Sequence, residues 1–178
     1  MVSASKPSTI GAVGCCWLAK CIDYQALYTR GIIIALALIA FGIATDLALY
    51  QTRVVPHVWD PVFDGQSERV LDSSVSRAIR RFTVIPDSAL GAFAYLTEIA
   101  LCLSLAPRSG ERVAGGRVRG ILFALNSLAL VVAGIALVAL QAFVVHAWCL
   151  LCLTSASISV VIAILAATEL RSAAVRQR

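Results

Sequence analysis

The chain has 178 residues, of which 60% are hydrophobic and only 14% are charged, and its formal net charge is +5. Its apolar runs are too long and too uninterrupted for the core of a soluble domain of this size. The positive charge does not call for a nucleic acid, because arginines beside anionic lipid headgroups account for it. The composition therefore predicts an integral membrane protein in contact with lipid.

Four apolar segments are long enough to cross roughly 30 Å of hydrocarbon as helices. They cover residues 31–50, 89–106, 120–146 and 148–170. Only Ala147 separates the last two segments, so these helices should be antiparallel neighbours joined by a very short turn. The sequence thus predicts an all-α fold, an integral membrane four-helix bundle that forms a single domain over residues 31–170. Residues 1–30 and 171–178 should be cytoplasmic flanks.

Basic residues near the ends of the four segments predict the orientation in the membrane. Those that would share one side are Lys6, Lys20, Arg30, Arg108, Arg112, Arg117, Arg119, Arg171, Arg176 and Arg178. Arginines in the loop over residues 51–88 oppose this assignment, although acidic residues accompany them. We expect both termini to be cytoplasmic. No organelle-targeting segment is visible, which is typical of a multi-pass protein of the bacterial inner membrane.

The loop over residues 51–88 should cover the outer face of the bundle. Its stretch "SERVLDSSVSRAIRRF", residues 67–82, places Leu71, Val75 and Phe82 at helical spacing with charged residues on the opposite face. This pattern predicts a short amphipathic helix that lies in the interface over the mouth of the bundle. The preceding "VPHVWDPVFDGQ" contains two prolines and a glycine, which indicates an extended lid segment.

The six cysteines can be sorted by compartment. Cys15, Cys16 and Cys21 would lie on the cytoplasmic side, where thiols stay reduced, and no fourth ligand nearby suggests a metal site. Cys102 lies deep in the second apolar segment and is expected to be a small packing residue. Cys149 and Cys152 remain as the pair on the oxidising face.

Cys149 and Cys152 form a Cys-x-x-Cys motif at the start of the fourth segment. Residues three apart share a helix face, so the two can form a disulfide, and the helix N-terminus favours a thiolate. His146, one turn earlier, could transfer protons or add positive charge, but an interfacial histidine facing headgroups is an equal alternative. Two cysteines in an apolar helix are often only small side chains. A position at the helix start, beneath an amphipathic lid, favours a redox pair.

Oxidation of thiols requires an acceptor for two electrons. The sequence contains no metal-binding cluster, no dinucleotide fingerprint and no haem attachment motif. Membranes supply quinones, so ubiquinone or menaquinone could enter between the helices and meet Cys152. Cys149 would stay accessible to a protein partner, because thiol exchange requires one sulfur that is attacked from water and one that hands electrons onward.

The stretch "QAFVVHAWCLLCLTS", residues 141–155, resembles the active-site stretch of the vitamin K epoxide reductase family. In that family a Cys-x-x-Cys opens the fourth helix of a four-helix bundle around a quinone. "SERVLDSS" is similar to the family's loop segment with a hydroxyl near the quinone, which implies Ser73 as a quinone-binding residue. "IPDSALGAFAY" is similar to the start of the second helix and implies Asp87 as a hydrogen-bonding partner of a quinone carbonyl. The resemblance covers about residues 30–170.

The chain departs from the family pattern in two places. Members usually carry a second cysteine pair in the outer loop, but no cysteine lies between Ile22 and Leu101, and Ser67 stands at the place of one of them. Ala156 stands where relatives that reduce vitamin K have a tyrosine. The resemblance therefore implies a quinone-dependent thiol oxidoreductase in which a reduced thioredoxin-like partner attacks Cys149 directly.

Two other functions stay open at this point. Loss of the loop cysteines is compatible with a catalytically silent membrane scaffold or assembly factor of the same fold, and the electron flow could also be reversed. Glu98, near the middle of the second segment, allows two interpretations as well. It is either a proton route to quinone or a protonated carboxyl bonded to Asn126 or Ser127, and the second is favoured at this depth.

Overall fold

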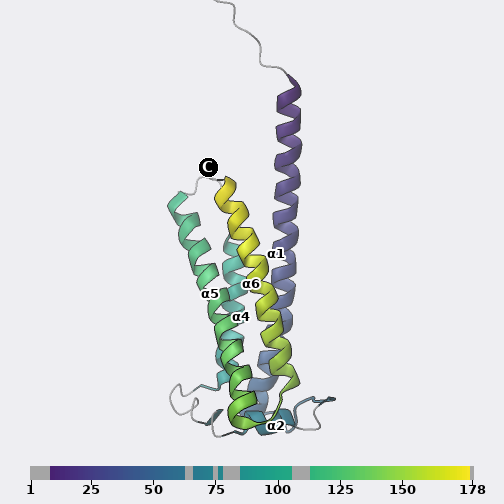
Figure 1. The fold of residues 1–178 in the computed structure, drawn as a ribbon, viewed down its shortest axis with the longest axis vertical. Helices are drawn as coiled ribbons and strands as arrows, with labels where there is room; N and C mark the ends of the chain where they lie inside the picture. The colour runs from purple at the N-terminus through teal and green to yellow at the C-terminus, as the bar shows by residue number, and fades with distance from the viewer. Residues whose placement is uncertain (1–8, 63–65, 74–75, 78–84, 106–112, 177–178) are drawn as a thin grey trace, which may run out of the picture.

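The computed structural model describes residues 9–62, 66–73, 76–77, 85–105 and 113–176. Within these ranges the chain is all-helical and has no strand, which confirms the all-α class. The elements are α1 (Thr9–Gln51), α2 (Gln66–Leu71), α4 (Asp87–Ser104), α5 (Val113–Leu140), the π-helix η1 (Gln141–Val145) and α6 (Leu150–Arg176) (Figure 1). Helix α1 is longer than the apolar segment predicted from the sequence, because it begins at Thr9.

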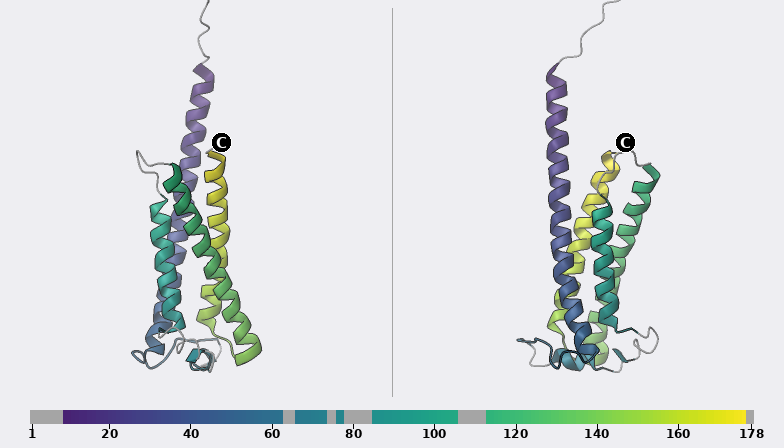
Figure 2. Two further views of the ribbon diagram at one scale, coloured as in Figure 1. Left: turned by 90° about the vertical axis from the view of Figure 1, so that its left-hand side faces the viewer. Right: turned by 180° about the vertical axis from the view of Figure 1, so that it is seen from behind.

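The four long helices lie side by side, and the short α2 lies across one end of them (Figures 1 and 2). Helix α1 packs against α4 and α6, and α5 packs against the same two helices. The N-terminal part of α1 extends beyond the other helices at the opposite end (Figure 2). All four helices therefore surround one interior, and the end that carries α2 is where the cysteine pair lies.

Three helices of the described chain are long and apolar enough to cross a membrane. These spans are Leu27–Gln51, Gly115–Val145 and Leu150–Arg171. Helix α4, which was predicted as a further span, is not among them. It has 18 residues and includes Asp87 and Glu98, whose carboxyl groups lower its mean hydropathy. These apolar helices indicate a membrane protein.

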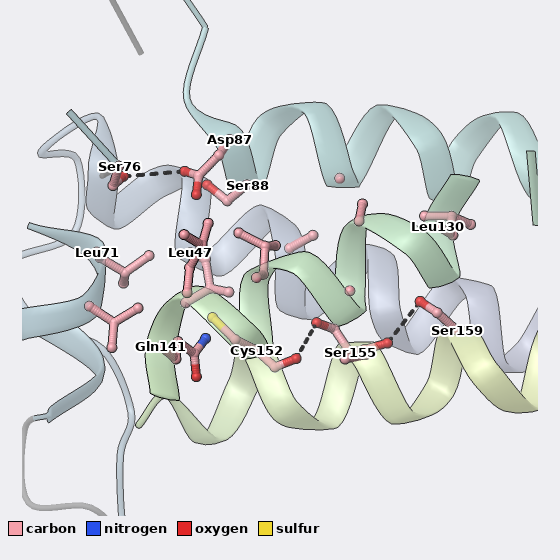
Figure 3. A pocket seen from close by; sticks show the side chains of 18 of the residues that line it. Leu47, Leu71, Ser76, Asp87, Ser88, Leu130, Gln141, Cys152, Ser155 and Ser159 are labelled. Carbon is pink, nitrogen blue, oxygen red and sulfur yellow. Dashed lines mark hydrogen bonds between the residues drawn. The ribbon is translucent and has the colours of Figure 1, made fainter. Parts of the chain in front are cut away.

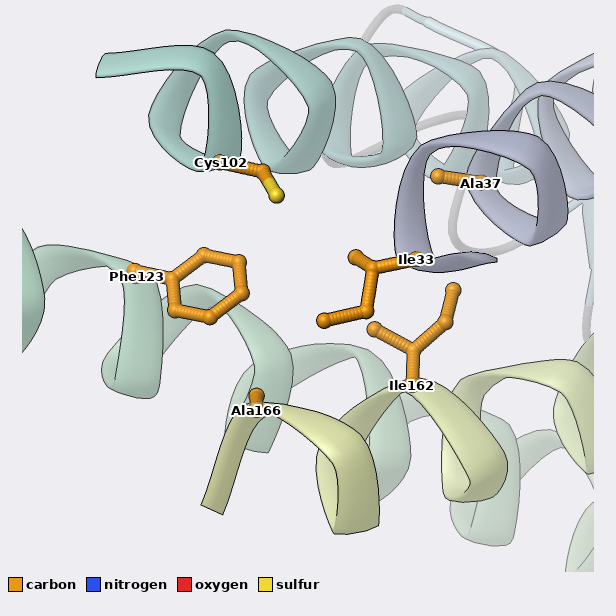
Figure 4. Packing of buried hydrophobic residues seen from close by; sticks show 6 residues of the cluster. All are labelled: Ile33, Ala37, Cys102, Phe123, Ile162 and Ala166. Atoms are coloured by element: carbon orange, nitrogen blue, oxygen red, sulfur yellow. The ribbon is translucent and has the colours of Figure 1, made fainter. Parts of the chain in front are cut away.

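One cluster of buried apolar residues lies in the half of the bundle away from α2 and draws side chains from all four long helices (Figure 4). Its buried members are Ile33, Ala37, Cys102, Phe123, Ile162 and Ala166. Cys102 thus packs as a small core residue, as expected. Nearer the middle, a Cβ added at Gly134 would lie 3.2 Å from the Cβ of Ala156. Small residues therefore let α5 approach α6 closely.

Two buried polar clusters tie the helices together. The carboxyl group of Glu98, which is 0% exposed, accepts a hydrogen bond of 2.5 Å from Asn126 Nδ2 and another from the Ser127 hydroxyl. Asn126 and Ser127 are the partners that the sequence analysis named for Glu98. At the other cluster, Arg30 Nε lies 2.5 Å from Glu169 Oε1. Each cluster supplies a partner to a charged or polar group that would be costly alone in this environment.

The amphipathic helix predicted over residues 67–82 is described in part, as α2 and as helical residues 76–77. Helix α2 ends at Leu71, and Asp72 and Ser73 follow in a turn and a bend. The carboxylate of Asp72 is held by the hydroxyl of Tyr50 at 3.2 Å and by Arg53 Nη2 at 3.0 Å, both from the end of α1. These contacts tie the end of α2 to the end of α1. Residues 74–75 and 78–82 of the predicted helix lie outside the described residues.

Candidate active site

Cys149 is the N-cap residue of α6. Its carbonyl oxygen accepts the hydrogen bond of Leu153 N–H at 3.0 Å, and its sulfur accepts that of Cys152 N–H at 3.3 Å. A side chain that accepts from the third residue of a helix is the usual arrangement of an N-cap. The cysteine pair therefore straddles the helix start, with Cys149 just before it. The connection between η1 and α6 spans residues 146–149, longer than the single residue expected.

The environment of Cys149 favours its thiolate. Hydrogen bonding from the Cys152 thiol is the largest influence and lowers the pKa of Cys149 from 9.0 to about 7. The backbone N–H of Cys152 and the hydroxyl of Ser67 lower this pKa further, whereas burial opposes them. At neutral pH a large share of the reduced pair thus carries one negative charge on Cys149. A thiolate is the reactive form in exchange with disulfides.

The loop covers Cys149 completely. The residue is 0% exposed and packs in one cluster with Val58 and Leu71, so the expectation of a partner-accessible thiol is wrong for this conformation. The apolar loop residues bury their own surface on the cysteine pair, which explains the cover. The Gln66 side chain also accepts the N–H of Trp148 at 3.2 Å, and this bond ties α2 to the turn that carries Cys149.

Ser67 lies beneath the same cover. It is 0% exposed, and its hydroxyl finds no hydrogen-bond partner in the geometry of the described residues. It lies close enough to Cys149 to favour the thiolate, so a rotation of the hydroxyl would direct its proton at the sulfur. Its backbone N–H is held by Asp60 Oδ2 at 3.0 Å. The structure therefore brings together Ser67 and Cys149, which are far apart in the sequence.

Cys152 faces a cavity of about 110 Å³ between the four long helices and the loop. Figure 3 shows its sulfur pointing into this space. Apolar side chains such as Leu47 and Leu130 make up most of the wall. The polar residues of the wall are Ser73, Ser76, Asp87, Ser88, Tyr95, Gln141, Ser155 and Ser159. Ser73 and Asp87, both named from the sequence, thus lie at the same cavity as Cys152.

The polar groups of the cavity near the loop form one hydrogen-bonded set. Asp87 Oδ1 accepts from Gln51 Nε2 at 2.5 Å and lies 3.5 Å from the Ser76 hydroxyl, which also donates to it. The Ser88 hydroxyl donates to the side-chain oxygen of Gln51. Ser73 Oγ accepts the N–H of Ser76 at 3.3 Å. Asp87 therefore acts as an acceptor here, which suits the hydroxyl of a quinol better than the carbonyl of a quinone.

A second polar set lies deeper in the cavity and was not found from the sequence. The hydroxyl of Tyr95 lies 2.7 Å from Ser159 Oγ and donates to the carbonyl of Ser155 at 3.1 Å. The Ser155 hydroxyl donates to the carbonyl of Cys152 at 3.0 Å. A signal for these serines was available, since Cys152, Ser155 and Ser159 share one helix face by their spacing. No comparable spacing in the sequence indicated that Tyr95 lies at the same cavity.

His146 lies outside this cavity. It has φ 51° and ψ 38°, the left-handed conformation that commonly ends a helix, and its side chain is exposed. Its role in proton transfer stays a prediction, and its backbone conformation terminates η1. No group of His, Cys, Asp or Glu side chains in the described ranges could hold a metal ion.

One comparison with known proteins finds a match. A family model described as the vitamin K epoxide reductase family matches residues 31–167, which is well over half of the chain. The matched range contains Cys149, Cys152 and every residue that lines the cavity. No curated protein matches the chain.

Proposed function

Since the chain belongs to the vitamin K epoxide reductase family, whose members are quinone-linked disulfide oxidoreductases, we propose that it passes electron pairs between a thioredoxin-like protein and membrane quinone. Cys149 and Cys152 are the proposed carriers. The observation that carries the proposal is the different surroundings of two adjacent sulfurs. Cys152 faces a cavity between apolar helices, whereas Cys149 lies under the loop as a stabilised thiolate.

The proposed cycle balances over two half-reactions. A thiolate of the reduced partner attacks the Cys149 sulfur, the S–S bond breaks, and Cys152 leaves as a thiolate. The partner's second thiol resolves the mixed disulfide, which releases the oxidised partner and leaves both cysteines reduced. The Cys149–Cys152 pair then gives two electrons and two protons to quinone, so that a quinol forms and the disulfide is restored.

The walls of the cavity support a quinone as the second substrate. Apolar helix faces suit a ring that partitions into lipid, and the Ser73 hydroxyl, whose oxygen accepts the N–H of Ser76, has a proton that it can donate to a carbonyl oxygen. Asp87 and Ser73 belong to the same wall, with Asp87 suited to accept from a quinol. Ubiquinone and menaquinone both meet these requirements. Ala156 offers no hydroxyl at the place of the tyrosine in vitamin K reducing relatives.

We propose that α4 completes a four-helix membrane bundle. Its packing against α1 and α5 supports this, as do the hydrogen bonds that satisfy the carboxyl groups of Asp87 and Glu98. The bundle domain would cover residues 31–170. The distribution of basic residues supports cytoplasmic termini, with residues 1–30 and 171–178 as flanks in a bacterial inner membrane and α2 at the outer interface.

The cover over Cys149 sets a condition on the partner. Because the sulfur is buried, the segment that carries α2 must move before a protein thiol can reach it. The contacts that must open include the bonds of Asp72 with Tyr50 and Arg53, the bond of Gln66 with Trp148, and the apolar packing of Val58 and Leu71 on Cys149. Such a loop opening is compatible with catalysis, since lids commonly open on the microsecond to millisecond timescale.

A second candidate is a membrane scaffold or assembly factor of the same fold. It is favoured by the absence of cysteine between Ile22 and Leu101 and by the burial of Cys149. A scaffold would not need Cys149 to be a stabilised thiolate beside a cavity that holds Cys152. This second observation favours the oxidoreductase.

Alkylation trapping in membranes separates the two candidates. The redox state of Cys149 and Cys152 is measured with and without added quinone, and Cys152→Ala is probed for mixed disulfides on Cys149. The oxidoreductase predicts a pair that oxidises with quinone and a trapped thioredoxin-like protein, and Cys102→Ala serves as the control because Cys102 is a core residue. Thiols that stay reduced at every quinone level, with nothing trapped, would establish the scaffold instead.

A further inference from the structure

Gln141 occupies an unusual place in the backbone. It begins the π-helix η1, Gln141–Val145, which continues α5 and ends at the left-handed His146. A π-helical turn accommodates an extra residue and occurs frequently at functional sites. The side chain of Gln141 is only 2% exposed and lines the cavity beside Cys152. A buried amide at such a turn needs partners for both its oxygen and its nitrogen.

The side chain of Gln141 lies beside both cysteines. Its Oε1 accepts the backbone N–H of Cys149 at 3.3 Å. A backbone N–H can only donate, so the end of the amide that faces it must be the oxygen, and the NH₂ group must point the other way. Figure 3 shows the amide nitrogen turned toward the sulfur of Cys152, and both side chains line the same cavity. One side chain therefore faces both members of the pair, with its oxygen toward Cys149 and its nitrogen toward Cys152.

We propose that Gln141 is a catalytic residue of the thiol exchange, which donates a hydrogen bond to the Cys152 sulfur as that sulfur becomes a thiolate. The inference rests on the proposed function for the course of the reaction, in which the S–S bond breaks and Cys152 takes the electron pair. Hydrogen bonds to ionised acceptors are stronger than those between neutral groups, so the contact strengthens as the negative charge develops. The hydrogen bond thus lowers the free energy of the Cys152 thiolate when it leaves Cys149.

Other groups near the Cys152 sulfur are engaged differently. The titratable residues that face it are Cys149 from the preceding turn and Asp87 and Tyr95 from α4. Asp87 accepts hydrogen bonds, and Tyr95 donates to the carbonyl of Ser155. Neither donates to the sulfur in this arrangement. The Gln141 amide is the donor that the backbone geometry holds in place.

The test measures the alkylation of Cys152 by iodoacetamide as a function of pH, in full-length protein in detergent that carries Cys149→Ser. The modified Cys152 peptide is quantified by mass spectrometry. Gln141→Leu should lower the rate at neutral pH about tenfold and move the midpoint of the pH profile upward by about one unit, because a charged hydrogen bond is lost. Gln141→Glu keeps the oxygen that accepts from Cys149 N–H and removes the amide donor, and it should act in the same direction.

Ser155→Ala is the matched control, because Ser155 lines the same cavity but donates to the Cys152 backbone carbonyl and not to the sulfur. It should leave the midpoint unchanged. If both Gln141 variants unfold at the temperature of the parent and keep its midpoint, the proposal is overturned. Quinone reduction by the protein with both cysteines is measured in parallel. If the Gln141 variants shift the midpoint of Cys152 alkylation but the protein with both cysteines reduces no quinone, the role of Gln141 at the sulfur is supported and only the proposed function is refuted.

Discussion

Replacement of Ser67 by alanine should raise the pKa of Cys149 without harming the fold. The hydroxyl of Ser67 is buried and favours the thiolate, but it has no hydrogen-bond partner in the described structure. A hydrogen bond to a charged group contributes about 1.5–3 kcal/mol, and about 1.4 kcal/mol corresponds to one pKa unit. Ser67 is a smaller influence than Cys152, so we expect the low end of this range, a rise of about one unit from about 7.

The stability of Ser67→Ala should move the other way. At pH below 7, where Cys149 is protonated and the hydroxyl lacks a partner, its replacement by a methyl group removes a desolvation cost, so the temperature of unfolding should stay the same or rise slightly. A loss of thiolate together with an unchanged fold would separate an electrostatic role of Ser67 from a packing role.

The assay is the pH profile of Cys149 alkylation in a Cys152→Ser background, which retains a hydroxyl donor at position 152. Alkylation of a buried thiol is slow, but its midpoint still reports the dominant closed state, because opening and deprotonation multiply in the observed rate. Ser157→Ala is the control, since Ser157 is exposed on α6 and donates to the carbonyl of Leu153. An unchanged midpoint in Ser67→Ala would refute the reasoning, whatever the control shows.

Four other outcomes follow from the site. The reduction potential of the Cys149–Cys152 couple should fall by about 59 mV per pH unit below the Cys149 pKa of about 7 and by about 30 mV per pH unit above it. The slope changes because the reduced pair binds two protons below this pKa and only one above it. A single slope across this range would contradict the lowered pKa. Ser67→Cys in a Cys152→Ser background should form a disulfide with Cys149, detectable by mass spectrometry without reductant, and its absence would place the two side chains too far apart. Asp72→Asn should speed Cys149 alkylation severalfold, because Tyr50 and Arg53 hold the loop through that carboxylate; an unchanged rate would mean that other contacts hold the cover. Glu98→Gln should keep the rate of quinone reduction within about twofold of the parent. Glu98→Leu should lower the unfolding temperature, because Asn126 and Ser127 lose their hydrogen-bond partner. A loss of turnover in Glu98→Gln would instead support a proton route through Glu98.

Local patterns in the sequence were enough to predict the helices and the cysteine pair. The apolar segment over residues 148–170 corresponds to α6, and the spacing of Cys149 and Cys152 places them together at its start. The length of α1 was underestimated, because polar residues before the apolar segment continue the helix to Thr9. Hydropathy predicts which residues of a helix contact lipid, but it does not predict where the helix begins or ends in water.

Contacts between distant segments could not be predicted in this way. Nothing near Cys149 in the sequence indicates that Val58, Ser67 and Leu71 cover it, since this burial depends on how the loop folds back. The π-helical turn that directs Gln141 inward is likewise a backbone feature without a residue signature. The resemblance to a family supplied Ser73 and Asp87, and both line the cavity.

The cover over Cys149 also decides which oxidants can damage the pair. A low-pKa thiolate is the form that peroxides convert to sulfenic and then sulfinic acid, the second of which most enzymes cannot reverse. With the sulfur 0% exposed, a peroxide in the surrounding water has no direct path to it while the loop is closed. The Cys152 sulfur faces a cavity with mostly apolar walls, and transfer of a hydrophilic oxidant from water into such a cavity is unfavourable. The packing that separates Cys149 from its partner therefore also protects the Cys149 thiolate from overoxidation between turnovers.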